Sequence, residues 1–206
     1  MKQIKAMKKI VLASGNPGKL AEFKNLLSKF GVEVYPQSEF EVSDADETGL
    51  TFVENAIIKA RHACTATGLA AIADDSGLEV DALNGAPGIY SARYSGEKAS
   101  DQANNVKLLQ ELAGVPFEQR SARYQCVLAF MNHSKDPTPI IAQGSWEGVI
   151  MEAARGDNGF GYDPIFWVPS HGCASAELDK GIKNGISHRA LAMQLLLNEL
   201  QKTLSA

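Results

Sequence analysis

The chain has 206 residues, of which 45% are hydrophobic and 21% charged, and its formal net charge is −4. This composition excludes a globally disordered chain, and the length suits one domain or two closely joined lobes. No stretch approaches the roughly 18 apolar residues that a membrane helix needs, the start does not read as a signal peptide, and the lack of a concentrated basic face argues against nucleic acid as a partner.

The cysteines and histidines indicate neither a disulfide framework nor a zinc site. Cys64, Cys126 and Cys173 lie far apart, and the four histidines are scattered. We therefore expect a reducing, cytoplasmic setting. Residues 1–6 precede a second methionine, Met7, and are predicted to be an N-terminal extension.

Strands and helices alternate along the first eighty residues. The predicted order is a strand at 9–13, a turn at 14–19, a helix at 20–30, a strand at 32–35, an acidic loop at 41–47, a helix from 52 to 67 and a strand at 69–73. The second helix is the best marked, because Thr51 and Glu54 form a capping box before it and Gly68 follows it.

The second half of the chain contains more strands. The predicted elements are a turn at 85–88, a helix after Ser100, strands at 124–131 and 139–151, a glycine-rich loop at 156–162, a strand at 165–168 and a final helix capped by Ser187. No repeat or long linker interrupts this order. The pattern predicts one compact α/β unit.

The turn Ser-Gly-Asn-Pro-Gly-Lys at 14–19 is a candidate phosphate-binding loop. Its glycines let backbone amides approach an anion, the next helix offers its positive end, and Lys19 supplies a point charge. It is not a Walker A loop, because Leu20 rather than Ser or Thr follows Lys19. An ordinary strand-to-helix turn is the alternative interpretation.

A pair of acidic residues follows a predicted buried strand. Asp74 and Asp75 stand at its carboxyl end, where ligands bind in open α/β sheets, and adjacent carboxylates there are costly unless a cation compensates them. Since neighbours in a strand point to opposite faces, we expect only one of the two to face a ligand. Glu47 of the acidic loop is a plausible partner in holding Mg²⁺. A turn-capping pair of aspartates is the alternative.

Two further segments carry candidate binding residues. The sequence Gly-Phe-Gly-Tyr-Asp at 159–163 places two aromatic rings between glycines, where they can stack on a base or simply edge the core. Lys183, His188 and Arg189 lie near the start of the last helix, where cations oppose the helix dipole. A ligand anion or carbonyl would explain them, and a solvated helix start is the alternative.

Together these motifs resemble the inosine/xanthosine triphosphate pyrophosphatase family. The matching segments, in chain order, are SGNPGK, DETGLTFVENA with Lys59 in phase, ADDSGLEVDALNGAPGIYSARYSG, GFGYDPIF and ISHR, and the resemblance runs from about residue 8 to residue 200. It implies a mixed central β-sheet flanked by helices, two lobes with a substrate cleft between them, and a homodimer. It also implies Mg²⁺-dependent hydrolysis of deaminated purine nucleoside triphosphates (ITP, dITP, XTP) to the monophosphate and pyrophosphate, which cleans the nucleotide pool.

The resemblance also assigns roles to individual residues. Asp75 would be the general base, and Glu47 with Asp75 would bind Mg²⁺. The residues expected to contact the substrate are Ser14, Gly15, Asn16, Pro17, Gly18, Lys19, Lys59, Ser76, Phe160, Gly161, Tyr162, Asp163, Lys183, His188 and Arg189. One position departs from the family pattern: Ile182 precedes Lys183 where an acidic residue is common.

Two other functions are open at this point. A related pyrophosphatase could act on pyrimidine or modified nucleotides, since similar α/β folds host both. A nucleotide sensor would bind without turnover, although the presence of both Glu47 and Asp75 argues against it, because binding alone need not place an attacking water.

Overall fold

The computed structural model describes residues 9–15, 17–28 and 31–205. Its strands are β1 (Lys9–Ala13), β2 (Glu33–Pro36), β3 (Ala70–Val80), β4 (Pro87–Gly88), β5 (Ser121–Met131), β6 (Ile140–Ile150), β7 (Phe166–Val168) and β8 (Cys173–Ala174). Its α-helices are α1 (Pro17–Ser28), α2 (Phe52–Thr67), α3 (Asp101–Glu111), α4 (Lys180–Ile186) and α5 (His188–Ser205). The predicted extension at residues 1–6 and the predicted helix end at Phe30 lie outside the described residues. Within that described part, no helix is long and apolar enough to cross a membrane.

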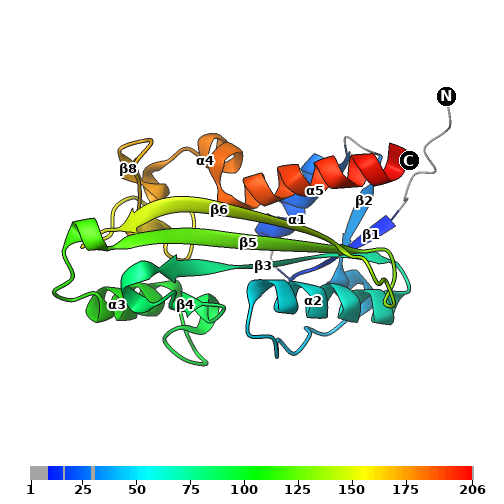
Figure 1. Ribbon diagram of the computed structural model, residues 1–206, viewed down its shortest axis with the longest axis horizontal. Coiled ribbons are helices and arrows are strands. Elements are labelled where there is room, and N and C mark those ends of the chain that lie inside the picture. Colours follow the sequence, from blue (N-terminus) through cyan, green and yellow to red (C-terminus); the bar gives the residue numbers. More distant parts are fainter. Residues whose placement is uncertain (1–8, 16, 29–30, 206) are drawn as a thin grey trace. The chain divides into compact units, whose positions relative to one another are not determined.

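The strands form one mixed sheet with the order β2-β1-β3-β5-β6-β7-β8, and β4 pairs with β3 (Figure 1). β1 lies between β2 and β3 and is parallel to both. Because α1 leads from β1 out to β2, and α2 leads back past β1 to β3, right-handed crossovers put these two helices on opposite faces of the sheet. Figure 1 shows α2 on one face and α1 with α5 on the other. The predicted α/β class is confirmed, and the expected substrate cleft stays a prediction.

Element boundaries were predicted well where a cap marks them. The hydroxyl of Thr51 accepts a hydrogen bond from the N–H of Glu54 at 3.3 Å, and α2 begins at Phe52, directly after Thr51. Gly68 ends α2 in the left-handed region with a φ of 68°. The prediction that the third strand ends at Ala73 is wrong, because β3 runs on to Val80. The polar residues 74–77 favour a turn by composition, but Leu78 and Glu79 pair with β4 and the chain stays extended through them.

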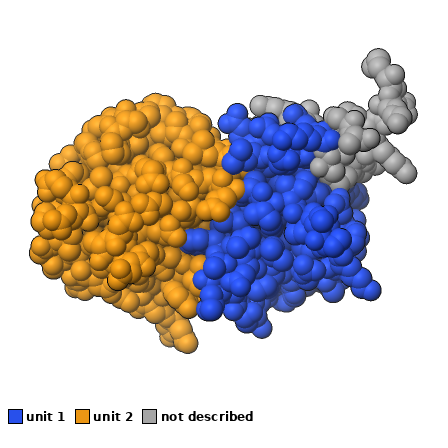
Figure 2. All heavy atoms as spheres, in the orientation of Figure 1, with its two compact units in different colours: residues 1–75, 127–142, 193–206 blue, residues 76–126, 143–192 orange. Residues whose placement is uncertain are grey.

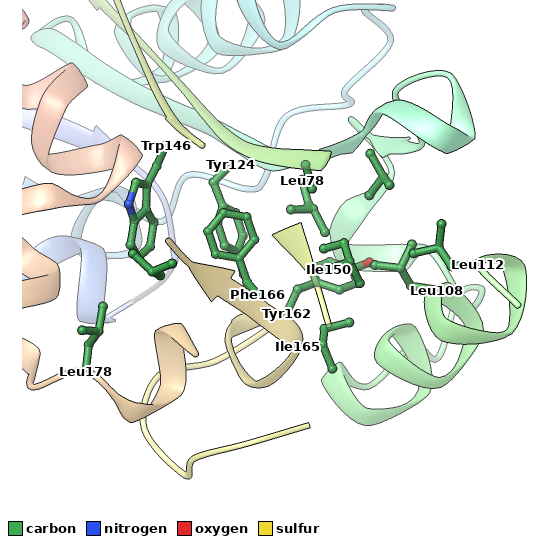
Figure 3. Packing of buried hydrophobic residues seen from close by; sticks show 13 residues of the cluster. Leu78, Leu108, Leu112, Tyr124, Trp146, Ile150, Tyr162, Ile165, Phe166 and Leu178 are labelled. Atoms are coloured by element: carbon green, nitrogen blue, oxygen red, sulfur yellow. The ribbon is translucent and has the colours of Figure 1, made fainter. Parts of the chain in front are cut away.

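The chain divides into two compact units, which Figure 2 colours separately. The first comprises residues 1–75, 127–142 and 193–206, and the second comprises residues 76–126 and 143–192. In the first unit, β1 packs against α2, and its core also includes the buried residues 71–73 of β3, Phe23 and Leu27 of α1 and the buried alanines of α2. In the second unit, Tyr124, Trp146 and Phe166 centre a cluster of thirteen buried residues (Figure 3).

Asp136 closes the connection between β5 and β6, and its loss should destabilise the first unit. The buried carboxylate accepts hydrogen bonds from the backbone N–H of Asn132 at 2.9 Å and of Thr138 at 3.0 Å. We expect Asp136→Ala to lower the free energy of unfolding by about 1–3 kcal/mol at neutral pH, since these donors lose their acceptor. Urea denaturation measures this loss.

The same variant has an expected pH dependence. The backbone N–H of Asn132 holds the pKa of Asp136 below its ordinary value, and the N–H of Thr138 adds to this effect. A carboxylate whose pKa is lower in the folded state stabilises the fold above its ordinary pKa and loses that contribution as the pH falls through the lowered value. The difference between wild type and Asp136→Ala should therefore shrink in acid. A difference that stays constant down to pH 3 would contradict the role given to this carboxylate.

Candidate active site

The candidate loop at 14–19 begins where β1 ends, at the point where the sheet order reverses. Ala13 pairs with Ala73, so Ser14 and Asp74 are the first residues beyond the pairing of β1 with β3. β2 lies on one side of β1 and β3 on the other, which is the position where open α/β sheets bind ligands. α1 starts at Pro17 directly after the loop. Asn16, a predicted substrate contact, lies outside the described residues.

Lys19 forms an ion pair with Asp74. Its Nζ lies 2.7 Å from Oδ1 of Asp74, whose side chain is fully buried, while 17% of the lysine side chain is exposed. The pair joins the first turn of α1 to β3. Lys19, which was predicted to contact phosphate, thus lies at this loop. Its ammonium is oriented by Asp74, a residue to which no separate role was assigned from the sequence.

The second acidic residue of β3 contacts a different helix. Lys59 of α2 lies 2.5 Å from Oδ1 of Asp75 and 2.9 Å from Oε1 of Glu47. Lys19 on α1 and Lys59 on α2 reach opposite faces of the sheet, so Asp74 and Asp75 alternate across it as period-two geometry predicts. The structure therefore brings together Glu47, Lys59 and Asp75, which are separated widely in sequence. We call Lys19, Glu47, Lys59, Asp74 and Asp75 the acid–lysine cluster.

Burial and neighbouring charges shift two pKa values in this cluster. Burial raises the pKa of Asp75 above its ordinary value; the Lys59 ammonium opposes the shift, and the charges of Glu47 and Asp74 add to it. Burial alone would lower the pKa of Lys59, but the carboxylates of Asp75 and Glu47 outweigh it, and the net pKa is raised. Lys59 therefore remains a cation at neutral pH, and Asp75 is a more basic carboxylate than an exposed aspartate.

The loop that carries Glu47 is fastened to the start of α2. The N–H of Gly49 donates to Oδ1 of the fully buried Asn55 at 2.9 Å, and the N–H of Leu50 donates to Oε2 of Glu54 at 2.9 Å. Gly49 has no room for a side chain, because a Cβ there would lie 2.6 Å from Cβ of Glu54 and 2.7 Å from Oδ1 of Asn55. Sequence reasoning missed Asn55, although an amide among the buried residues of a helix was a signal available in the sequence.

In the second unit, Asp163 organises the predicted aromatic loop at 159–163. Its side chain is almost fully buried, and its carboxylate accepts hydrogen bonds from the N–H of Phe160 at 2.8 Å and the hydroxyl of Ser175 at 2.8 Å. It also forms an ion pair with Lys183. Gly159 has a φ of +81°, and a Cβ there would overlap the carboxylate of Asp163. The carboxylate thus points into the protein and holds the loop closed.

The two aromatic rings of this loop lie in different environments. Phe160 is 56% exposed, and Nζ of Lys183 lies 5.3 Å from the centroid of its ring. Tyr162 is buried in the cluster of Figure 3, and its hydroxyl donates to the carbonyl oxygen of Ser91 at 2.8 Å. Of the two rings predicted to stack on a base, only that of Phe160 is exposed to solvent. The ring of Tyr162 is buried and anchors the loop to the core.

His188 and Arg189 form the buried first turn of α5. Both are less than 10% exposed, and the imidazole of His188 stacks on the ring of Tyr124 with the centroids 4.8 Å apart. The hydroxyl of Ser187 accepts a hydrogen bond from the N–H of Ala190 at 3.3 Å, as the predicted cap requires. These two side chains are therefore built into the protein interior, so the alternative of a solvated helix start does not hold for them.

The acid–lysine cluster has the chemistry to bind a metal through few protein ligands. Within residues 9–15, 17–28 and 31–205, no group of three or more His, Cys, Asp or Glu side chains is arranged to hold a metal. Glu47 and Asp75 nevertheless converge on one cation, the ammonium of Lys59. Two carboxylates suit a hard divalent cation that takes its remaining ligands from phosphate oxygens and water.

Comparisons with known proteins agree with the predicted family. A dITP/XTP pyrophosphatase from Vibrio vulnificus strain YJ016 is 63% identical over 196 residues, which cover 95% of this chain and 98% of that protein. A dITP/XTP pyrophosphatase from Vibrio cholerae is 62% identical over 196 residues, with the same coverage.

Solved structures show the same fold. The HAM1 protein from Coxiella burnetii superposes with a TM-score of 0.91 at 53% identity, covering 95% of this chain and 99% of that one. The Ham1 protein from Staphylococcus aureus gives a TM-score of 0.87 at 45% identity, covering 95% of this chain and all of that one. The model of the Ham1 family matches residues 10–199. With the matching motifs, the shared fold and these identities, the chain belongs to the Ham1 family.

Proposed function

We propose that this protein hydrolyses deaminated purine nucleoside triphosphates (dITP, ITP and XTP) to the monophosphate and pyrophosphate, and so keeps them out of DNA and RNA. The observation that carries the proposal is the convergence of Glu47 and Asp75 on Lys59. A polyphosphate with a divalent cation needs such carboxylates, and hydrolysis needs a base beside them. The relatives named dITP/XTP pyrophosphatase support the choice of substrate.

We propose Mg²⁺ as the divalent cation, with Glu47 and Asp75 as its protein ligands. Both carboxylates already bind a cationic group in this structure, so the donor set fits a small hard cation without a third acidic ligand. Bound there, Mg²⁺ would neutralise phosphate oxygens and stabilise the charge of the leaving pyrophosphate.

The chain's own residues then divide the remaining work. Backbone N–H groups of the loop at 14–19, in which Pro17 has none to donate, and the ammonium of Lys19 bind oxygens of the triphosphate, where the start of α1 also favours negative charge. Asp75 orients a water molecule and accepts its proton, a role that its raised pKa suits. Lys59 holds Asp75 and Glu47 in place through its two ion pairs, and its positive charge attracts the phosphates.

We assign recognition of the base to Phe160, Lys183, His188 and Arg189. Phe160 offers an exposed ring for stacking, and Lys183 lies beside that ring. Hypoxanthine and xanthine carry a carbonyl at C6 where adenine carries an amine. Donors from His188, Arg189 or loop amides would be left without an acceptor against adenine, and a site built in this way rejects the wrong base strongly.

A panel of triphosphates tests the proposal against its rivals. Pyrophosphate release with Mg²⁺ should be much faster from dITP, ITP and XTP than from dATP, dGTP, dTTP or UTP. Faster turnover of dTTP or UTP would favour the pyrimidine-directed alternative. Nucleotide binding without turnover of any member would favour the sensor.

Replacing Gly49 tests whether the placement of Glu47 matters. We expect Gly49→Ala to lower kcat for dITP by about 10²-fold, because the added Cβ displaces the loop from α2 and a shift of about 1 Å is enough for such a loss. A Mg²⁺ titration should show a weaker apparent affinity as well. Gly181→Ala, at a helical glycine of α4 with nothing within 4 Å of its Cβ position, is the control for a general glycine effect. Equal kinetics for Gly49→Ala and wild type would remove this loop from the mechanism.

A homodimer and a cytoplasmic location, both expected from the sequence, stay predictions. Sedimentation equilibrium of the purified chain would measure its oligomeric state directly.

A further inference from the structure

Helix α3 holds the loop that carries Phe160. Oδ2 of Asp101 accepts a hydrogen bond from the N–H of Gly161 at 2.6 Å. Nδ2 of Asn105 donates to the carbonyl oxygen of the same glycine at 3.0 Å. The two side chains are four residues apart, so they lie on one face of the helix and together bind both peptide units that flank the Cα of Gly161.

These two hydrogen bonds constrain the backbone beside Phe160. Gly161 has a φ of 62°, a left-handed conformation that glycine adopts without strain. The peptide between Phe160 and Gly161 is held at one end by Asp101, and the N–H of Phe160 is held by Asp163. With both neighbouring peptides fixed, the direction in which the exposed Phe160 ring leaves the backbone is fixed too.

A contribution to stability does not explain why an asparagine stands at position 105. Its Oδ1 is buried and finds no hydrogen-bond partner among the residues that the structure describes. A buried unsatisfied acceptor costs free energy, and an apolar side chain of similar shape would avoid that cost. What the amide provides at this position is its donation to Gly161.

We propose that Asp101 and Asn105 are positioning residues for recognition of the base. They act through Gly161 and keep the ring of Phe160 oriented for stacking, with Lys183 beside it. This inference rests on the proposed function, in which Phe160 stacks on the purine. Neither residue is assigned any contact with the triphosphate.

The test separates the base from the phosphates by using two ligands. Asp101→Ala, Asn105→Leu and their double variant are compared with wild type for hydrolysis of dITP and for inhibition by inorganic tripolyphosphate, which has no base. We expect the double variant to raise KM for dITP about tenfold with little change in kcat, since one stacked base contributes roughly this much to binding. The inhibition constant of tripolyphosphate should not change. Asp101→Asn should restore KM, because its amide oxygen can still accept from Gly161.

Two controls separate positioning from general damage. Ser100→Ala removes the cap of α3, in which the hydroxyl accepts from the N–H of Ala103 at 3.1 Å, but leaves both bonds to Gly161. It should lower Tm without raising KM. In a Phe160→Ala background, the Asp101 and Asn105 variants should add nothing further, because they act through that ring.

Several outcomes would overturn the inference. Additive losses in the Phe160→Ala background, or an equal rise in the inhibition constant of tripolyphosphate, would show that α3 does not act through the ring. Metal-free titration of IMP by calorimetry needs no turnover, and the double variant should bind IMP about tenfold more weakly than wild type. If wild type failed to hydrolyse dITP, the proposed function would be wrong. Unchanged IMP binding in the double variant would refute only the positioning role of Asp101 and Asn105.

Discussion

Asp75→Asn should lower kcat for dITP by about a thousandfold, within the range that loss of a general base produces. The substitution keeps the shape of the side chain but removes the charge and the basicity that its raised pKa indicates. The fold should persist, because Lys59 keeps its ion pair with Glu47 at 2.9 Å. Single-turnover kinetics at saturating Mg²⁺ would measure the chemical step directly.

A matched control comes from an exposed carboxylate just beyond β3. Asp81 pairs with Arg123 at 2.8 Å and has no part in the proposed mechanism, so Asp81→Asn should leave kcat close to the wild-type value. If Asp75→Asn retained a kcat within tenfold of wild type, Asp75 would not be the base. Thermal denaturation of both variants would exclude unfolding as the reason for any loss.

Asp163→Ala should be the most destabilising of these substitutions, with an expected loss of about 3–5 kcal/mol in the free energy of unfolding. The carboxylate is 2% exposed, and its removal leaves the ammonium of Lys183 without its counter-charge. It also takes the acceptor from the N–H of Phe160 and the hydroxyl of Ser175. Urea denaturation followed by circular dichroism would measure the loss.

The double variant Asp163→Ala, Lys183→Met distinguishes an ion pair from a simple cavity. Removing both charges should recover part of the lost stability, because no uncompensated ammonium remains. A double variant less stable than Asp163→Ala alone would mean that Lys183 stabilises the loop through its contact with the Phe160 ring and not through its charge pair. A loss below 1 kcal/mol in Asp163→Ala would refute the organising role of this carboxylate.

Local signals in the sequence predicted the elements that begin or end at a cap. Thr51 and Gly68 bound α2 as expected, since their side-chain and backbone preferences act within a few residues. The extension of β3 through Asp74 and Asp75 could not be predicted in the same way. Those residues have low strand propensity, and only pairing with distant strands keeps them extended.

The candidate site was predictable as a set of residues but not as a set of contacts. The motifs placed Glu47, Lys59 and Asp75 on the list of site residues. That both carboxylates meet one ammonium depends on the path of the acidic loop, which is held by one hydrogen bond to Asn55 and one to Glu54. Asp163 was expected to touch substrate, a prediction that stays untested, while its carboxylate is engaged by groups of the chain itself. Nothing in the sequence distinguishes an aspartate that faces a ligand from one that closes its own loop.

Asp74 and Asp75 are consecutive in an extended strand, so their side chains point to opposite faces of the sheet. Which lysine each one contacts therefore depends only on its position along the strand. Deleting one residue from segment 70–73 would present the carboxylate of Asp75 to Lys19 on α1 and would turn that of Asp74 toward Lys59 on α2 or away from both. The short stretch between the start of β3 and this acidic pair is therefore fixed in length, and the burial of Ala71, Ile72 and Ala73 restricts the size of its side chains as well. Length polymorphism among relatives should accumulate in the surface connections and spare these four positions.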